Sequence, residues 1–191
     1  MGNQTASAQR GASLVEVLVA MVILAVGLLG LVGLQARLHV LQMESYQRAQ
    51  ALILLTDMGN RLALNRINAG SYVSASSAGL GVSAACPVAN TSRAERDLRE
   101  WCLALQGAAE TSGGNNVGVM VGGRGCIEQP DPNIDEYLIT VAWQGLAPVS
   151  APPDSVDCGE TLYDGAAGSP CVGELCRRVV TTLVRISDLT P

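Results

Sequence analysis

Few residues in this chain could do chemistry. Glu16 is the one charged residue in an otherwise apolar run from Ala12 to Leu34, and His39 is the single histidine. A charged side chain at the centre of a membrane helix costs about 2.5 to 3.5 kcal/mol, and less near the interface. Glu16 must therefore either reach headgroup water or meet a cation. The other reactive side chains are six cysteines beyond the apolar run: Cys86, Cys102, Cys126, Cys158, Cys171 and Cys176.

The composition excludes several classes of enzyme. All 12 basic residues are arginines, so a phosphate-binding loop that needs lysine is impossible, and one histidine cannot make an HExxH metal site. The net charge is -5 and no arginine cluster lines one face, which disfavours a nucleic-acid partner. We expect no catalytic residue, no cofactor, no metal ion and no nucleic acid, and we interpret His39 as a solvated surface residue.

The even number of cysteines predicts disulfides, because all of them lie in the part of the chain that we expect to be exported to an oxidising compartment. Their connectivity is open. We expect Cys86 to pair with Cys102 or Cys126, and two of the last three cysteines to close the final loop. The alternative is zinc at Cys171 and Cys176 with further thiolates, but no second close pair and no nearby histidine support it.

The element that carries Glu16 is predicted to be a membrane-spanning helix. The 23 residues 12–34 would extend about 35 Å, more than the roughly 30 Å of a bilayer core. A secretory signal peptide has a shorter apolar region, of about 7 to 15 residues. Residues 1–11 form a polar leader with Arg10 before the span, which favours a cytoplasmic amino terminus and an exported remainder.

Residues 35–68 are predicted to continue this helix as an amphipathic stem. Proline is absent from residues 1–86, so we expect one helix from Ser13 to Asn65, about 80 Å long, whose outer half packs on a sheet. Three glycines in the span favour either local melting or close helix packing: Gly27, Gly30 and Gly33. The expected apolar stripe of the stem consists of Leu34, Leu38, Leu41, Ala49, Leu52, Leu55 and Leu62.

Residues 69–191 are predicted to form a disulfide-stabilised head. Ser92 and Glu95 make a capping box, and Gly107 ends the helix that they begin. Short β-branched runs between glycines and prolines indicate an antiparallel sheet, and segment 146–176 is expected to be irregular. The expected strands are 116–121, a short piece around Cys126, 137–143 and 178–186, with a turn at 122–125. The fold class is therefore α+β, a long amino-terminal helix packed on a small antiparallel sheet.

The segment from Gly11 to Glu16, GASLVE, followed by VLVAMVILAVGLLG, resembles the class III signal of type IV pilins. That signal has a polar leader, a glycine, a first mature residue and a glutamate five residues beyond the glycine, before an apolar helix. The resemblance implies that a prepilin peptidase cleaves after Gly11 and methylates the new amino group of Ala12. It also implies that Glu16 faces the Ala12 ammonium of a neighbouring subunit. Ala12 stands where the family usually has phenylalanine.

The stem and head resemble minor pilins, specifically the PilV group, which implies a type IV pilin-like fold. The resemblance implies a low-abundance subunit, anchored in the bacterial inner membrane with a periplasmic head, that primes pilus assembly and ends at or near the fibre tip. Adhesion and twitching motility would follow. Implied partners are other minor pilins, the major pilin, the prepilin peptidase, the inner-membrane assembly platform and a tip adhesin. The segments that carry the resemblance are 33–38, 45–51, 57–61, 97–101, 125–127, 137–145 and 177–180.

Two other functions stay open. A minor pseudopilin of a type II secretion system carries the same signal, and the long cysteine-bearing head ranks it second. A membrane-tethered periplasmic enzyme is the alternative from another class, although one histidine and no metal-ligand cluster leave it little catalytic chemistry.

Overall fold

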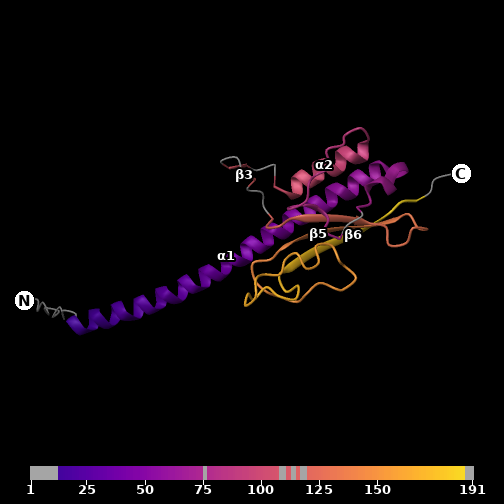
Figure 1. Cartoon of the computed structure of the whole chain (residues 1–191). Helices are drawn as coiled ribbons and strands as arrows, with labels where there is room; N and C mark the ends of the chain where they lie inside the picture. The colour runs from indigo at the N-terminus through magenta and orange to yellow at the C-terminus, as the bar shows by residue number, and fades with distance from the viewer. Residues whose placement is uncertain (1–12, 75–76, 108–110, 113–114, 117–119, 188–191) are drawn as a thin grey trace, which may run out of the picture. The chain divides into compact units, whose positions relative to one another are not determined.

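The computed structural model describes residues 13–74, 77–107, 111–112, 115–116 and 120–187 (Figure 1). The chain divides into two units, Met1–Gln42 and Met43–Pro191. The described part of the first unit is the beginning of helix α1 (Leu14–Leu64), and every residue from Ser13 to Gln42 is exposed. The long helix confirms the one predicted from Ser13 to Asn65, and it follows from a segment without proline and rich in leucine and alanine.

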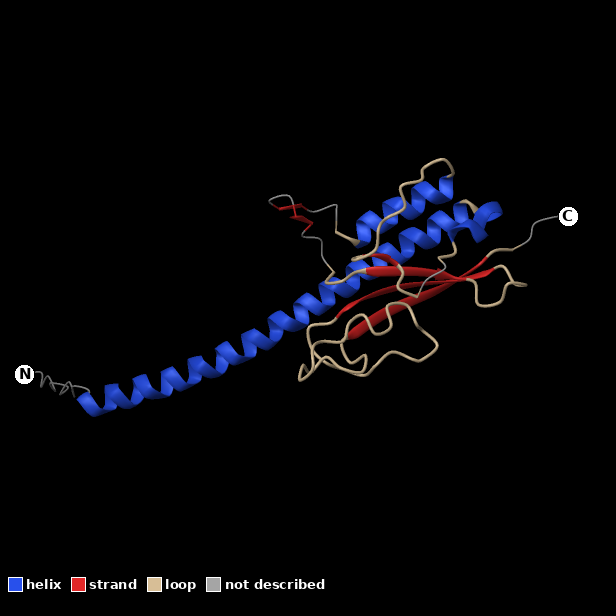
Figure 2. Ribbon diagram, viewed as in Figure 1, coloured by secondary structure: helices blue, strands red, loops and turns tan. Residues whose placement is uncertain are grey.

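The second unit contains the rest of α1 and an α+β head (Figure 2). Its sheet has four antiparallel strands in the order β1-β4-β5-β6, and a separate two-stranded ladder joins β2 and β3. The elements after α1 are the 3-10 helix η1 (Arg66–Tyr72), β1 (Leu80–Gly81), α2 (Arg93–Leu105), β2 (Thr111–Ser112), β3 (Asn115–Asn116), β4 (Arg124–Glu128), β5 (Glu136–Gln144) and β6 (Arg177–Arg185).

Different elements cover the two faces of the sheet. Figure 2 shows α1 and α2 on one side of the sheet and the loop between β5 and β6 on the other. The alternation along β5 follows this division, because Ile139 and Val141 belong to the core under the helices whereas Ala142 packs on the loop side. The core on the helix side includes Ala51, Leu55, Met58, Leu62, Tyr72, Trp101, Leu105, Ile127, Ile139, Val141 and Trp143.

Several predicted elements are confirmed. The strands expected at 137–143 and 178–186 are β5 and β6, which pair over nine residues, and segment 146–176 has neither helix nor strand. The capping box starts α2: the Ser92 hydroxyl accepts a hydrogen bond from the Glu95 N–H at 3.2 Å, and the Glu95 carboxylate accepts one from the Ser92 N–H at 2.9 Å. Gly107, with φ +71°, follows the end of the helix.

The apolar stripe predicted for the stem is wrong in its register. Of the predicted residues only Leu55 and Leu62 are buried; Ala49 is exposed and Leu52 is 45% exposed. Apolar residues occupy more than one side of this helix, so its periodicity alone does not select the face that meets the sheet. The buried residues of α1 are Gln47, Ala51, Leu55, Met58 and Leu62.

The region before β4 also differs from the prediction. Asn116 belongs to β3 and Val121 lies in a turn, so the strand expected at 116–121 is wrong at its far end. Residues 117–119 of that prediction lie outside the described part. The turn expected at 122–125 is confirmed only for its first half, because Arg124 and Gly125 belong to β4. Strand β1 was not predicted; it lies in the expected connector and pairs with the start of β4.

Candidate processing and assembly site

Gly11 and Ala12 lie outside the described residues, so the described site begins at Ser13. The Ser13 carbonyl accepts a hydrogen bond from the Glu16 N–H at 3.0 Å, and the Ser13 hydroxyl accepts one from the same N–H at 3.2 Å. Ser13 is therefore the N-cap of α1. Glu16 was predicted from the sequence and Ser13 was not, although the spacing Ser-x-x-Glu at 13–16 is itself a capping signal.

The cap places Glu16 in the first turn of α1. The amino end of a helix carries a partial positive charge, which favours a carboxylate there. Glu16 is exposed, and within the part of the chain that the structure describes its carboxylate has no ion pair or hydrogen bond. Among its described residues, the first unit thus presents an exposed acidic group at the start of α1.

The helix that carries Glu16 is long and apolar enough to cross a membrane, and none of its most apolar 18-residue window is buried. Gly27, Gly30 and Gly33 lie along this exposed surface. A Cβ added at any of them would have no atom within 4 Å beyond the backbone of the helix itself. The space fits the approach of another helix, and the alternative of local melting stays open.

His39 is exposed on α1. No group of three or more metal-ligating side chains is present among the described residues. Cys171 and Cys176, the candidates for zinc, are joined in a disulfide, so neither offers a thiolate.

A polar cluster joins the end of α1 to α2. Arg61 Nη1 donates to Asp97 Oδ1 at 3.1 Å and to Glu100 Oε2 at 2.6 Å, while Arg61 Nε donates to Asp57 Oδ2 at 2.9 Å. Partial burial alone would lower the pKa of Arg61, but the hydrogen bonds to Glu100 and to the aspartates raise it above its ordinary value. Arg61 therefore stays charged and holds the two helices together.

Tyr72 extends this cluster into the core. Its hydroxyl donates a 2.5 Å hydrogen bond to Asp97 Oδ2 and accepts one from Asn65 Nδ2 at 3.1 Å. Burial, together with the hydrogen bond to Asp97, raises the pKa of Tyr72 to about 12. The 3-10 helix is thereby tied to α2 and to the end of α1.

Three disulfides hold the head. Cys86 pairs with Cys102, one of the two partners that we considered, and Cys171 pairs with Cys176 in the loop before β6. The pair between Cys126 and Cys158 was not among the expected ones, because the connectivity depends on β4 lying beside the segment after β5.

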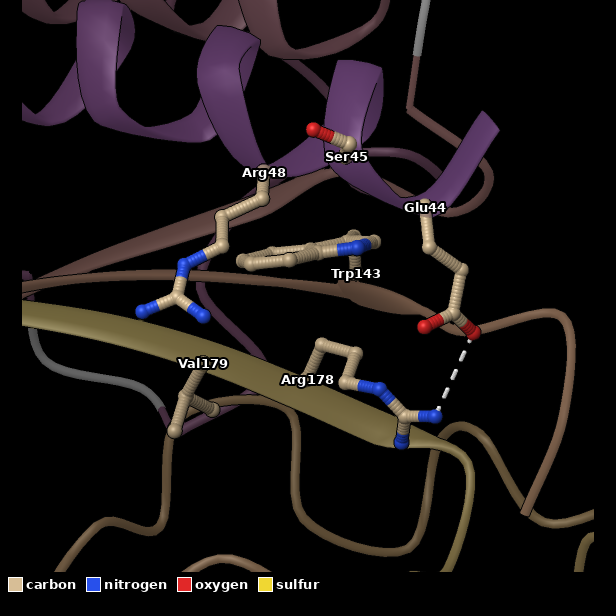
Figure 3. A pocket seen from close by; sticks show the side chains of 6 residues that line it. All are labelled: Glu44, Ser45, Arg48, Trp143, Arg178 and Val179. Carbon is tan, nitrogen blue, oxygen red and sulfur yellow. Dashed lines mark hydrogen bonds and ion pairs between the residues drawn. The ribbon is translucent and has the colours of Figure 1, made fainter. Parts of the chain in front are cut away.

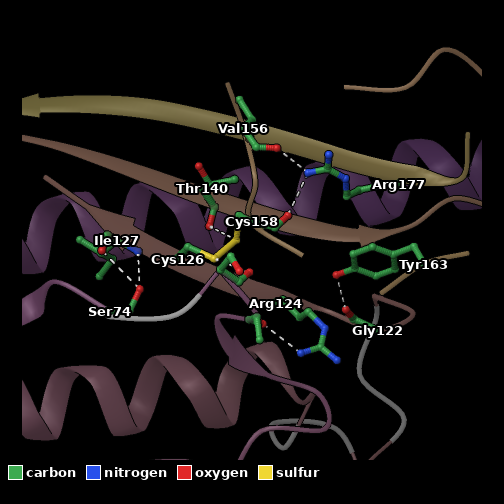
Figure 4. Close-up of a disulfide and its surroundings, with 12 residues drawn as sticks. Ser74, Gly122, Arg124, Cys126, Ile127, Thr140, Val156, Cys158, Tyr163 and Arg177 are labelled. Atoms are coloured by element: carbon green, nitrogen blue, oxygen red, sulfur yellow. Dashed lines mark hydrogen bonds between the residues drawn. A yellow bond between two sulfur atoms is a disulfide. The ribbon is translucent and has the colours of Figure 1, made fainter. Parts of the chain in front are cut away.

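Hydrogen bonds around the Cys126–Cys158 disulfide stabilise the loop side of the sheet (Figure 4). Arg177 Nη1 donates to the carbonyls of Val156, at 2.6 Å, and Cys158, at 3.2 Å, and the Tyr163 hydroxyl donates to the Gly122 carbonyl at 2.8 Å. Burial raises the pKa of Tyr163 above its ordinary value. The long loop is thus fixed by covalent and polar contacts in place of regular structure.

Comparison with known proteins assigns the amino-terminal segment. Residues 6–32 match the family described as the prokaryotic N-terminal methylation motif. The matched range contains the capped start of α1, Glu16 and most of the apolar run. No curated protein and no solved structure matches the chain significantly.

Proposed function

We propose, on the premise that its methylation motif makes this chain a type IV pilin-type protein, that it is a minor pilin which primes assembly of a type IV pilus. The observation that carries the proposal is the match over residues 6–32 together with the exposed, membrane-length helix. The motif and the helix support membrane anchoring and association with a pilus. The motif also favours a structural protein over a membrane-tethered enzyme.

Processing is the first step that we propose. A prepilin peptidase hydrolyses the peptide bond between Gly11 and Ala12, so that water supplies one oxygen of the new Gly11 carboxylate and the Ala12 nitrogen is protonated to an ammonium. One methyl group is then transferred from a methyl-donor cosubstrate to that nitrogen in place of a proton, so the nitrogen keeps its positive charge. Cleavage removes Arg10 and creates a cation at the start of the apolar helix.

Assembly uses the new cation. The Ala12 ammonium of one subunit pairs with Glu16 of its neighbour, where the surroundings are apolar and either charge alone is costly. A slip by one residue separates the two charges, so the pair sets the register of the bundle. Exposure of Glu16 at the capped start of α1 supports this role.

The head remains outside the hydrocarbon. We propose that the inner membrane holds the subunit with its amino terminus in the cytoplasm and the head in the periplasm, before it moves to the pilus tip with other minor pilins. There it contacts the major pilin and a tip adhesin, and supports adhesion and twitching motility. Three disulfides fit a head that works outside the reducing cytoplasm.

Processing is tested by intact mass of the membrane-extracted protein. Gly11→Val is expected to retain residues 1–11, whereas Gly2→Val, a matched change in the same leader, is expected to lose them. Normal cleavage of Gly11→Val would contradict the proposal. The number of oxidised cysteines and the methyl group are read from the same spectrum.

A minor pseudopilin of a type II secretion system is the competing assignment, because it carries the same signal. Deletion of the gene is expected to abolish pili and twitching while secreted enzymes persist. Loss of the secreted enzymes with normal piliation would reject the pilus assignment and favour the pseudopilin.

A further inference from the structure

Strand β6 is an edge strand that is left open. It is the last strand in the order β1-β4-β5-β6 and pairs with β5 along nine residues. Beyond this ladder, no backbone hydrogen bond of residues 178–185 is found in the described part of the chain. Its outer N–H and C=O groups are therefore available to another strand.

A groove runs between this edge and α1. One cleft, of about 630 Å³, is lined by α1 residues from Leu52 to Ala63 and by the consecutive residues Thr181 to Arg185 of β6. Neighbouring side chains of a strand point to opposite faces, so five consecutive lining residues mean that the backbone edge itself forms the wall. A second cleft, of about 370 Å³, lies farther along, where Trp143 of β5 also lines it between Arg48 of α1 and Arg178 of β6.

The middle of the edge lacks the features that usually prevent strand addition. Proteins protect edges with charged side chains, proline, bulges or a covering segment. The arginines of β6 lie at its two ends, residues 179–184 contain neither a charged residue nor proline, and the pairing with β5 is unbroken. Leu183 is 53% exposed, and on the α1 wall Leu52 is 45% exposed. An added strand would therefore bury apolar side chains of both β6 and α1.

The dimensions suit an extended segment. Residues 178–185 of β6 offer about 23 Å of edge at about 3.3 Å per residue. Residues 44–63 of α1 run about 28 Å at about 1.5 Å per residue. A strand of seven or eight residues therefore fits along the groove.

The charged residues at one end of the groove indicate what kind of segment binds there. Arg48 is exposed, and it has no ion pair or hydrogen bond within the described residues. Figure 3 shows the side chains of Arg48 and Arg178 near the Trp143 ring. Arg178 is already paired with Glu44 at 3.4 Å, so Arg48 is the cation that lacks a partner.

The same charges argue against a second copy. The charged residues of β6 are all arginines: Arg177, Arg178 and Arg185. Arg178 and Arg185 are already paired with Glu44 and Glu136, and β6 itself contains no acidic residue, so a second copy of β6 brings no carboxylate to Arg48. An acidic partner strand supplies that carboxylate.

We propose that the groove between α1 and β6 binds an extended segment of another protein, which adds to the sheet as a fifth strand beside β6 and places a carboxylate next to Arg48. Alternate apolar side chains of the segment cover Leu52 on α1 and Leu183 on β6. Main-chain hydrogen bonds supply the binding, and Arg48 supplies the preference for an acidic residue.

The test uses the full chain in detergent micelles and capped eight-residue peptides of alternating valine and threonine with glutamate at one end or the other. Amide hydrogen exchange of residues 178–185 is measured by mass spectrometry. At saturating peptide we expect exchange there to slow at least about tenfold. A peptide with proline at alternate positions, which removes donors, is expected to give no protection.

Four variants locate the binding. Leu52→Arg fills the groove and is expected to abolish protection, whereas Leu64→Arg, an exposed leucine of the same helix outside the groove, is expected to preserve it. Replacing the peptide glutamate by glutamine is expected to weaken binding up to about fivefold. Arg48→Gln is expected to remove that difference, while Arg99→Gln on α2 is expected to retain it.

Four results would overturn the proposal: no protection of β6 at saturating peptide, protection that persists in Leu52→Arg, a glutamate preference that persists in Arg48→Gln, or protection of β6 that rises with the concentration of the protein alone. The last result would show that a second copy occupies the edge. None of them bears on cleavage after Gly11, so failure here is distinct from failure of the proposed function.

Discussion

The Ser13 hydroxyl accepts a hydrogen bond from the Glu16 N–H, so the residue that caps α1 holds the backbone of the residue that carries the charge. The cap begins the helix one residue before Leu14. Glu16 consequently lies in the first turn, where the helix dipole favours its carboxylate. The position of the acid relative to the amino terminus that we propose at Ala12 thus depends on where the helix starts.

Ser13→Ala is expected to destabilise the first turn of α1. Loss of an N-cap costs about 1 kcal/mol, which corresponds to roughly fivefold faster amide exchange in the first turn. The exchange of residues 14–17 measured in detergent micelles checks this. Ser45→Ala, a serine within the same helix, serves as the control, and equal exchange in the two variants would show that Ser13 does not cap α1.

Tyr72→Phe is expected to destabilise the head. The substitution leaves Asp97 without its 2.5 Å hydrogen bond from the phenol, and a buried polar group that loses its partner costs about 1 to 3 kcal/mol. Urea unfolding followed by the fluorescence of Trp101 and Trp143, both in the second unit, measures the loss. Tyr46→Phe, at a tyrosine that is 48% exposed, is expected to change the midpoint little.

The same tyrosine predicts a pH dependence. Its pKa is raised from 10.0 to about 12, so the folded state favours the neutral phenol. This contribution is fully present below pH 10 and is lost as the pH rises from 10 towards 12. The free energy of unfolding of the wild type is expected to fall more steeply over that range than that of Tyr72→Phe. Parallel curves would contradict the assignment.

The disulfides are expected to differ in their contribution to stability. Cys126 and Cys158 are 32 residues apart and Cys171 and Cys176 only five. The chain-entropy model gives about 4 kcal/mol for the longer loop and about 2 kcal/mol for the shorter one. The double alanine variants, compared by urea unfolding, test this order, and a reversed order would mean that the loop lengths do not govern the effect.

Alanine substitutions at two glycines are expected to change the stability of the head in opposite directions. A Cβ at Gly125 would overlap the Trp101 ring, so Gly125→Ala is expected to lose about 3 kcal/mol. A Cβ at Gly59 would lie 3.7 Å from Val184 Cγ2, an ordinary contact, and alanine stabilises a helix interior by about 1 kcal/mol. An unchanged or raised urea midpoint for Gly125→Ala would contradict the packing of α2 on β4, and a lowered midpoint for Gly59→Ala would contradict the space beside α1.

The elements that were predictable have strong local causes. Helix α1 follows from a long run without proline, and α2 from the reciprocal bonds of Ser92 and Glu95. Strands β5 and β6 follow from β-branched runs. The buried face of the stem was not predictable in this way, because Leu52 and Leu55 are equally apolar and only the position of the sheet distinguishes them.

The candidate site was likewise only partly predictable from the sequence. Glu16 stood out because a lone carboxylate in an apolar run is costly. Ser13 was not selected, although the spacing Ser-x-x-Glu at 13–16 is a capping signal, because Glu16 was considered only as a charge and not as the third residue of a helix. The pair of Cys126 with Cys158 joins segments brought together by the sheet, and no sequence spacing indicates it.

The central claim is that Glu16 meets the Ala12 ammonium of a neighbouring subunit, and competitive incorporation of Glu16→Gln tests it most directly. Wild type and variant are co-expressed, and their ratio is measured by peptide mass spectrometry in the membrane and in sheared fibres. We predict equal amounts without residues 1–11 in the membrane, but at least about tenfold less variant in fibres, because the ammonium loses its partner. Glu160→Gln, an exposed glutamate of the head, is expected to enter freely. A Glu16→Gln subunit that enters fibres as readily as the wild type would contradict the account.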